Sequence, residues 1–264
     1  MDHVLFVIFG ILISYLFSIL GAVSMWSRNS FLFHSITHCL LTSTALAIFF
    51  NQEHLVSYYN IFFSIIIAIV INILNKKKIE INTVVYLINF TCLVVFITIC
   101  HIGNLNINSI DSYLFGDLFL IGRVDLIVTF ILSFIVTVIA IKHHKQIILY
   151  IINQDIAKIK YKNSEKIILL ITIIQALFVA VAIKYIGTFL VSTSLLIPAI
   201  IFHNLSPKKN IIYSFSITFM AYIASYSIGV KYSIPFSISF GCSLLLFLIF
   251  FSLKYVNFSN KIIK

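Results

Sequence analysis

Residues 158–186 read KIKYKNSEKIILLITIIQALFVAVAIKYI, a lysine-rich segment followed directly by the apolar run 167–186. A helix of about 20 apolar residues crosses the roughly 30 Å hydrocarbon core of a bilayer. The same alternation recurs along the chain, because all but three of the 18 lysines and arginines (Arg123, Lys184 and Lys231) lie in short clusters between or beyond apolar runs. Basic loops that stay in the cytoplasm during membrane insertion give this pattern. The net charge of +10 therefore orients the chain in a lipid bilayer and does not indicate binding to nucleic acid.

The composition predicts the same class of protein. Hydrophobic residues make up 61% of the chain and charged residues 10%, whereas soluble domains carry about 25% charged residues. The four cysteines lie in apolar runs without a CxxC pair, which favours small core residues over a disulfide framework or a thiolate metal site. The sequence has no GxxxxGK[ST] nucleotide-binding motif, so it is not expected to be an enzyme. We predict a single all-α, polytopic transmembrane domain over residues 1–264, powered by a separate polypeptide if ATP drives it.

About nine membrane spans are predicted, and eight is the alternative because the seventh is short. The predicted spans are 4–26, 30–50, 55–74, 84–102, 124–141, 167–186, 187–203, 210–230 and 234–256. If all nine cross, the N-terminus lies outside and the C-terminus in the cytoplasm, and every basic cluster falls on the cytoplasmic side. The loop 103–123 is too apolar for a simple solvated loop, which makes it a candidate re-entrant segment.

The second predicted span carries two histidines, His34 and His38. A spacing of four places both imidazoles on one helix face, about one turn apart, which suits a single metal ion. Neutral imidazole binds zinc and other divalent first-row metals. The alternative is a pair of histidines that hydrogen-bond between helices. Because ionisable groups inside spans are costly in hydrocarbon, we treat both as functional candidates.

Two other segments are candidates for function. Ser192, Ser194 and Pro198 interrupt the seventh span, which predicts a broken helix whose freed carbonyl groups line a polar path. The alternative is a structural kink packed against neighbouring helices. The longest polar stretch, 153–166, is either a segment that docks on a soluble partner or a solvated basic loop.

Four motifs, in this order and spacing, resemble a known family. They are WSRNS at 26–30 followed by His38, YLFGDL at 113–118, Asp155-Ile156-Ala157, and GTFLVSTSLLIPA at 187–199. Over about residues 21–250 the chain resembles the permease subunits of the zinc, manganese and iron uptake ATP-binding cassette transporters, and most of all the zinc-uptake permeases.

The resemblance implies a set of partners. Two permease copies would form the pathway in a bacterial inner (plasma) membrane, two cytoplasmic ATP-binding cassette ATPase subunits would drive it, and a periplasmic binding protein would deliver the metal. Residues 153–166 would be the coupling segment that seats in the ATPase, with Asp155, Ala157 and Tyr161 in that contact. Zinc would be the transported substrate, without a permanently bound cofactor. The aspartate and histidine that face the path in the family correspond here to His34 and His38, so the resemblance implies that both are transient metal contacts in the translocation path.

The chain also departs from the family pattern. His34 stands where the family has an aspartate, which exchanges a carboxylate for an imidazole and shifts the expected preference toward zinc over manganese. Tyr161 stands at the glycine of the coupling loop. A manganese or iron permease of the same family is the alternative. An ion-coupled secondary transporter is less favoured, because it would need carboxylates inside the spans.

Overall fold

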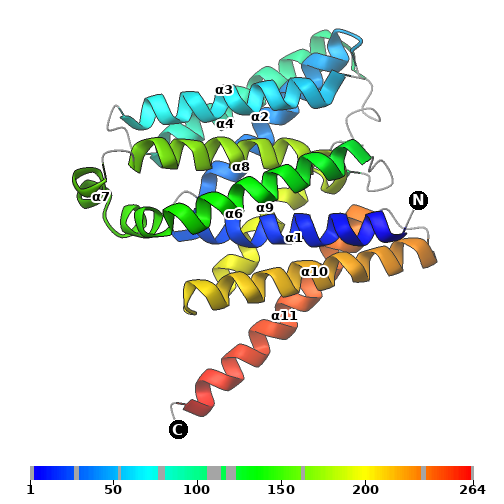
Figure 1. Cartoon of the computed structure of the whole chain (residues 1–264). Helices are drawn as coiled ribbons and strands as arrows, with labels where there is room; N and C mark the ends of the chain where they lie inside the picture. Colours follow the sequence, from blue (N-terminus) through cyan, green and yellow to red (C-terminus); the bar gives the residue numbers. More distant parts are fainter. Residues whose placement is uncertain are drawn as a thin grey trace.

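The computed structural model describes residues 3–26, 30–52, 55–76, 81–105, 114–116, 123–161, 164–232 and 236–262, and the regular secondary structure in these ranges is helical (Figure 1). The helices are α1 (His3–Trp26), α2 (Ser30–Phe49), α3 (Val56–Lys76), α4 (Ile81–Ile102), α6 (Arg123–Ile152), α7 (Gln154–Lys160), α8 (Ser164–Ile186), α9 (Thr188–Ile201), α10 (Pro207–Tyr232) and α11 (Phe236–Ile262). Most lie roughly side by side, whereas α11 diverges from the bundle.

Each predicted span corresponds to one helix. Within the described residues, α1, α3, α4, α6, α8 and α10 are long and apolar enough to cross a membrane, and α2, α9 and α11 contain shorter apolar segments. The predicted class, a polytopic helical membrane protein, is confirmed. The exception in length is α9, whose 14 residues extend about 21 Å. This is less than the roughly 30 Å of hydrocarbon that a spanning helix must cover.

Two boundaries differ from those expected from the sequence. The fifth span was expected to end at residue 141, before the basic cluster, but α6 continues to Ile152 and has 30 residues. Lysine is a good helix former, and the Lys142 and Lys145 side chains are exposed, so the helix passes through the cluster without burying charge. The seventh span was expected to be interrupted, but α9 is a continuous helix that includes Pro198.

Aromatic side chains join α1 to its neighbours in the core. The rings of Phe17 on α1 and Phe178 on α8 meet edge to face, with their centroids 5.1 Å apart. Tyr222 on α10 stacks on Phe6 at 4.5 Å and donates a hydrogen bond from its hydroxyl to the Phe6 carbonyl oxygen at 3.2 Å. Gly10 makes room for this ring, since a Cβ atom there would lie 2.3 Å from a Tyr222 carbon. Such pairs fix how the helices cross.

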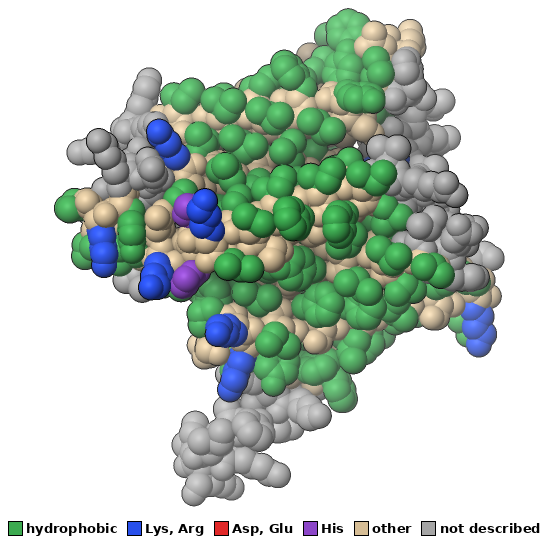
Figure 2. Space-filling model, in the orientation of Figure 1, with side chains coloured by type: hydrophobic (Ala, Val, Ile, Leu, Met, Phe, Trp, Pro, Cys, Tyr) green, Lys and Arg blue, Asp and Glu red, His purple; other side chains and the backbone are tan. Residues whose placement is uncertain are grey.

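The outer surface divides into an apolar body and a basic end. Large hydrophobic side chains cover the body in Figure 2, and residues such as Phe90 and Phe134 are 70% and 62% exposed. A lipid environment accounts for an apolar surface of this extent. Exposed lysines gather at the end of the bundle where α7 lies; these are Lys142, Lys145, Lys160, Lys166, Lys208 and Lys209. Lys231 lies in the last turn of α10, with its ammonium 5.3 Å from the centre of the Tyr232 ring.

Candidate functional site

Hydroxyl groups attach α2 to α4 inside the bundle. Ser35 Oγ donates a hydrogen bond to the Val85 carbonyl oxygen at 3.0 Å, and Thr42 Oγ1 donates to the Cys92 carbonyl oxygen at 2.8 Å. From the first bond to the second, the residue number rises by seven on α2 and also by seven on α4, so the two helices run parallel at this contact. Because polar groups facing lipid need internal partners, these hydroxyls place this face of α2 against protein.

The two candidate histidines lie one turn apart on α2. This helix packs against α3, α4, α8 and α9. The His38 side chain is half-buried, whereas the His34 side chain falls outside the described part of the chain. Among the side chains that are described, no group of three His, Cys, Asp or Glu could hold a metal ion. The role of His34 and His38 as transient metal contacts therefore stays a prediction.

The second candidate element, α9, lies among five helices: α1, α2, α8, α10 and α11. Ser192, Ser194 and Pro198 are all buried on it. Ser194 Oγ donates to the carbonyl oxygen of Val191 at 3.1 Å, within its own helix. The structure therefore brings the proline-bearing helix against the histidine-bearing helix, while the role of these residues in lining a path stays a prediction.

A buried asparagine closes the far end of α9. The last carbonyl groups of a helix have no partner inside the helix. Asn210, which is 0% exposed near the start of α10, donates from Nδ2 to the Ala199 carbonyl oxygen at 2.9 Å. Its Oδ1 accepts a hydrogen bond from the Ser214 hydroxyl at 3.2 Å. One side chain thus fixes the short helix α9 to α10.

We expect the substitution Asn210→Ala to destabilise the protein by about 1–2 kcal/mol, because it leaves a buried carbonyl and a buried hydroxyl without this partner. The apparent melting temperature in detergent, followed by size-exclusion chromatography after heating, measures the effect. Asn204→Ala is the matched control, since Asn204 is exposed in the turn between α9 and α10. Equal melting temperatures for the two variants would contradict this role of Asn210.

Two of the quoted sequence motifs meet through glycines. Gly116, from YLFGDL, and Gly187, from GTFLVSTSLLIPA, both have positive φ, 70° and 86°. A Cβ on Gly116 would lie 2.4 Å from the Gly187 nitrogen, and a Cβ on Gly187 would lie 2.4 Å from the Leu114 carbonyl oxygen. Residues 114–116, in the middle of the candidate re-entrant loop 103–123, therefore pack backbone to backbone on the junction of α8 and α9. Residues 106–113 and 117–122 of that loop lie outside the described residues, so re-entry stays a prediction.

The polar stretch 153–166 contains a short helix, α7, which protrudes at the basic end of the bundle (Figure 1). Asn153 caps it, because its Oδ1 accepts a hydrogen bond from the Ile156 backbone amide at 3.1 Å. Ala157 is 0% exposed, whereas Ile156 and Ile159 are 51% and 87% exposed. The helix therefore packs against the bundle through Ala157, while the side chains of Ile156 and Ile159 remain exposed.

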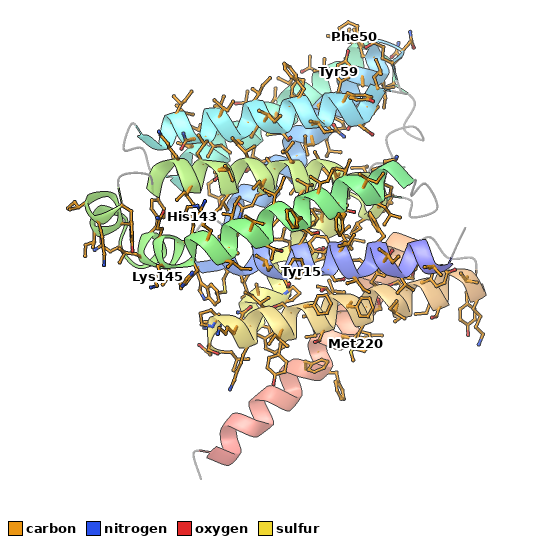
Figure 3. All side chains as sticks on the ribbon, viewed as in Figure 1. Tyr15, Phe50, Tyr59, His143, Lys145 and Met220 are labelled. Atoms are coloured by element: carbon orange, nitrogen blue, oxygen red, sulfur yellow. The ribbon has the colours of Figure 1, made fainter. Side chains whose placement is uncertain are left out.

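Basic and aromatic side chains lie on and near α7 at this end of the bundle. The Lys160 ammonium lies 5.8 Å from the centre of the partly exposed Tyr161 ring. His143 and Lys145 lie at the same end on α6 (Figure 3). The Asp155 side chain falls outside the described residues, so its part in a docking contact stays a prediction.

Sequence reasoning missed a polar contact between spans. The Ser43 hydroxyl on α2 hydrogen-bonds Asn60 Oδ1 on α3. An asparagine within an apolar run is a signal that Asn60 needs a partner.

The chain resembles known transport proteins along nearly its whole length. The profile of the ABC 3 transport family matches residues 3–258. The high-affinity zinc uptake system membrane protein ZnuB of Buchnera aphidicola subsp. Acyrthosiphon pisum is 30% identical over 238 residues, which are 86% of this chain and 88% of ZnuB. The ZnuB of Haemophilus influenzae is 26% identical and covers 72% of each chain. The structure of PsaBC from Streptococcus pneumoniae in complex with Fab has a TM-score of 0.75 and 18% identity, covering 93% of this chain and 88% of that one. At this identity the last similarity concerns the fold.

Proposed function

Since the chain belongs to the ABC 3 transport family, we propose that it is the permease subunit of an ATP-binding cassette importer for divalent metal ions, with zinc as its substrate. The observation that carries the proposal is the family match across the whole membrane body, residues 3–258. The zinc uptake proteins among the relatives support the choice of metal. The apolar helices and the family together place the chain in the inner membrane as a multi-pass protein.

The distribution of charge supports an orientation. Positive residues concentrate on the cytoplasmic side of membrane proteins, and the exposed lysines gather at the end that carries α7. This end is then cytoplasmic, the N-terminus lies outside, and the C-terminus inside. The ATPase subunit docks on α7 and its surroundings, whereas a periplasmic metal-binding protein docks at the opposite end. No cofactor is held permanently, because the metal passes through.

A second copy of the chain completes the pathway, and α4 is the helix best placed to meet it. Only 11% of its membrane-spanning segment is buried within one copy, compared with 67% for α1 and α8. Its partly or fully exposed residues include Asn89, Thr91 and Thr98, which are polar for a surface facing lipid alone. Polar side chains of this kind stabilise contacts between membrane helices. The path then runs between the copies, near α2 and α4.

Transport works by alternating access. Closure of the ATPase subunits on ATP moves α7, and this movement switches the central helices between inward and outward openings. His34 and His38 contact the metal briefly on its way, because tight coordination by four ligands would slow its release. High affinity resides in the external binding protein, and no residue of this chain performs covalent chemistry.

The acidic residues favour this function over an ion-coupled secondary transporter. Such a transporter needs carboxylates within its spans to relay protons or bind ions. The eight acidic residues of this chain are Asp2, Glu53, Glu80, Asp111, Asp117, Asp125, Asp155 and Glu165, and each lies outside the described helices or in the first turn of one. Manganese or iron remains the alternative substrate within the same family.

The test is uptake of radioactive zinc by cells that lack their own zinc importer and express this chain with its cognate ATPase and binding protein. We expect the wild type to import zinc and a His34→Ala/His38→Ala variant to lose most uptake, since removing groups around a metal costs about 10–100-fold in affinity or activity. His203→Ala is the control, because His203 is exposed and its Nδ1 lies 2.9 Å from the Ile200 carbonyl oxygen.

Membrane levels of each variant and its binding of the ATPase are measured in parallel. Unchanged zinc uptake by the double variant would show that the two histidines have a structural role and do not contact the metal. A wild type that imports manganese or iron, and no zinc, would overturn the assignment of the metal while leaving the permease function in place.

A further inference from the structure

An apolar cleft lies between α1, α6 and α8. It has a volume of about 300 Å³, is partly open, and is lined by aliphatic side chains that include Val23 on α1, Ala140 on α6 and Ile171 on α8. Water is a poor occupant, because an apolar cavity offers it no hydrogen-bond partner. A helix of another protein is about 10–12 Å wide with its side chains, which is too wide for a space of this volume. The cleft therefore suits a thin, flexible hydrocarbon chain.

This cleft extends to the basic end of the bundle. The hydroxyls of Tyr15 on α1 (Figure 3) and Thr137 on α6 share a hydrogen bond of 2.7 Å. The two helices run in the same direction (Figure 1). Val23 follows Tyr15 by eight residues, and Lys145 follows Thr137 by eight residues, so they lie at about the same level. Part of the cleft is therefore level with the lysines of α6.

Positive charge surrounds this part of the cleft. Lys142 and Lys145 lie within the stretch of α6 that lines it, and Lys166 lies at the start of α8. All three side chains are exposed, at the end where lysines gather in Figure 2. The stretch 142–166 has six lysines against two acidic residues. Basic sites between membrane helices bind the headgroups of anionic lipids.

Two polar atoms on the same stretch of α6 have no hydrogen-bond partner among the residues that the structure describes. They are His143 Nδ1 and Gln146 Oε1, and both atoms are buried although their side chains are half-buried as a whole. A buried polar atom without a partner is costly, so it indicates a ligand or water that completes its hydrogen bonds. A phosphate oxygen accepts a hydrogen bond from an imidazole N–H, and a headgroup hydroxyl donates one to an amide oxygen.

We propose that this cleft holds one acyl chain of an anionic phospholipid from the leaflet at the basic end, with its phosphate beside Lys142, His143 and Lys145. The apolar lining binds the chain, and the lysines select the charge of the headgroup. The lipid fills the space between α1, α6 and α8, and so holds together the part of α6 that leads into α7. This inference requires only that the chain spans a membrane, so it does not depend on which metal is transported.

The binding test uses the full chain in a non-ionic detergent, with phosphatidylglycerol as the probe and phosphatidylcholine as the neutral comparison. Native mass spectrometry measures the dissociation constant of each lipid. We expect phosphatidylglycerol to bind more tightly, and Lys142→Gln/Lys145→Gln to weaken its binding about 30-fold, the factor expected for two lysines at a membrane surface. Lys208→Gln/Lys209→Gln is the matched control: it removes the same charge at the same end from α10, which does not line the cleft, and should change the affinity much less.

A further variant tests the cleft itself. Ala140→Phe places a ring in the space for the acyl chain and should prevent phosphatidylglycerol binding. The apparent melting temperature without lipid should stay near that of the wild type, because the ring fills an existing cleft. Val138→Phe is the control, since Val138 points outward from the same helix and is 45% exposed. An Ala140→Phe protein that binds phosphatidylglycerol as tightly as Val138→Phe does would overturn the site.

A third measurement needs no variant. Phosphatidylglycerol with a photoreactive diazirine in its acyl chain should label Val23 and Ala140 in the wild type, as located by mass spectrometry. Unlabelled phosphatidylglycerol should compete with this labelling more strongly than phosphatidylcholine. Labelling spread evenly over the exposed helices, or equal competition by the two lipids, would indicate unselective bilayer lipid and overturn the proposal. So would equal affinity of the wild type and Lys142→Gln/Lys145→Gln for phosphatidylglycerol.

Discussion

Replacing Gly187 with alanine is expected to cost about 3 kcal/mol or more of stability, enough to prevent recovery of folded permease. Gly187 has φ 86° and ψ 155°, a region of backbone conformation that is essentially restricted to glycine. An added Cβ would also lie 2.4 Å from the Leu114 carbonyl oxygen and 2.5 Å from the Phe115 carbonyl carbon. Both obstacles are backbone atoms, so a change of side-chain rotamer cannot relieve them. The substitution therefore separates the 114–116 segment from the start of α9.

The yield of monodisperse protein and its apparent melting temperature in detergent measure this effect. Gly241→Ala is the matched control in a helix: its Cβ would approach only the flexible end of the Leu190 side chain, at 3.2 Å, and its φ is not in the positive region. We expect the control to behave nearly as the wild type. A Gly187→Ala protein that is as stable as Gly241→Ala would show that the junction of α8 and α9 can move, contrary to the packing described here.

The class of fold could be predicted from the sequence because two strong signals agree. Apolar runs of spanning length give the helices, and the lysine clusters between them give the alternation of sides. The end of α6 was misplaced because the basic cluster at residues 142–145 was taken as the end of a helix, whereas the helix continues through it to Ile152. Lysine is itself a good helix former, so a cluster of lysines does not end a helix.

The site was predictable only where its residues share one helix. The spacing of His34 and His38 suffices to place them on one face of α2, and the composition of 153–166 suffices to indicate a polar segment between two apolar helices; the roles of both stay predictions. Contacts between distant parts of the chain carry no such periodicity. Ser43 meets Asn60, and Gly116 meets Gly187, only because different segments of the chain pack together. The two glycines lie within the quoted motifs, but the motifs alone do not show that they meet.

The second large effect is expected at α7. In the proposed orientation this helix lies in the cytoplasm, where exposed isoleucines have no lipid to cover them, and Ile156 and Ile159 are 51% and 87% exposed. We therefore expect Ile156→Ser/Ile159→Ser to lose zinc uptake while the permease remains folded. A well-packed anchor at an interface contributes about 2 kcal/mol or more, which corresponds to roughly 30-fold in the dissociation constant for each.

Co-purification of the ATPase with the permease, measured beside uptake, locates the defect. The control is Lys208→Ser/Lys209→Ser, which changes two exposed residues at the same end but outside α7. Loss of both ATPase binding and uptake in the isoleucine variant alone would identify α7 as the docking element, because Ala157, which seats the helix, is untouched. Normal ATPase binding with lost uptake would assign α7 to transmission of the ATPase movement. Normal binding and normal uptake would contradict the coupling role, and the exposed isoleucines would then need another partner.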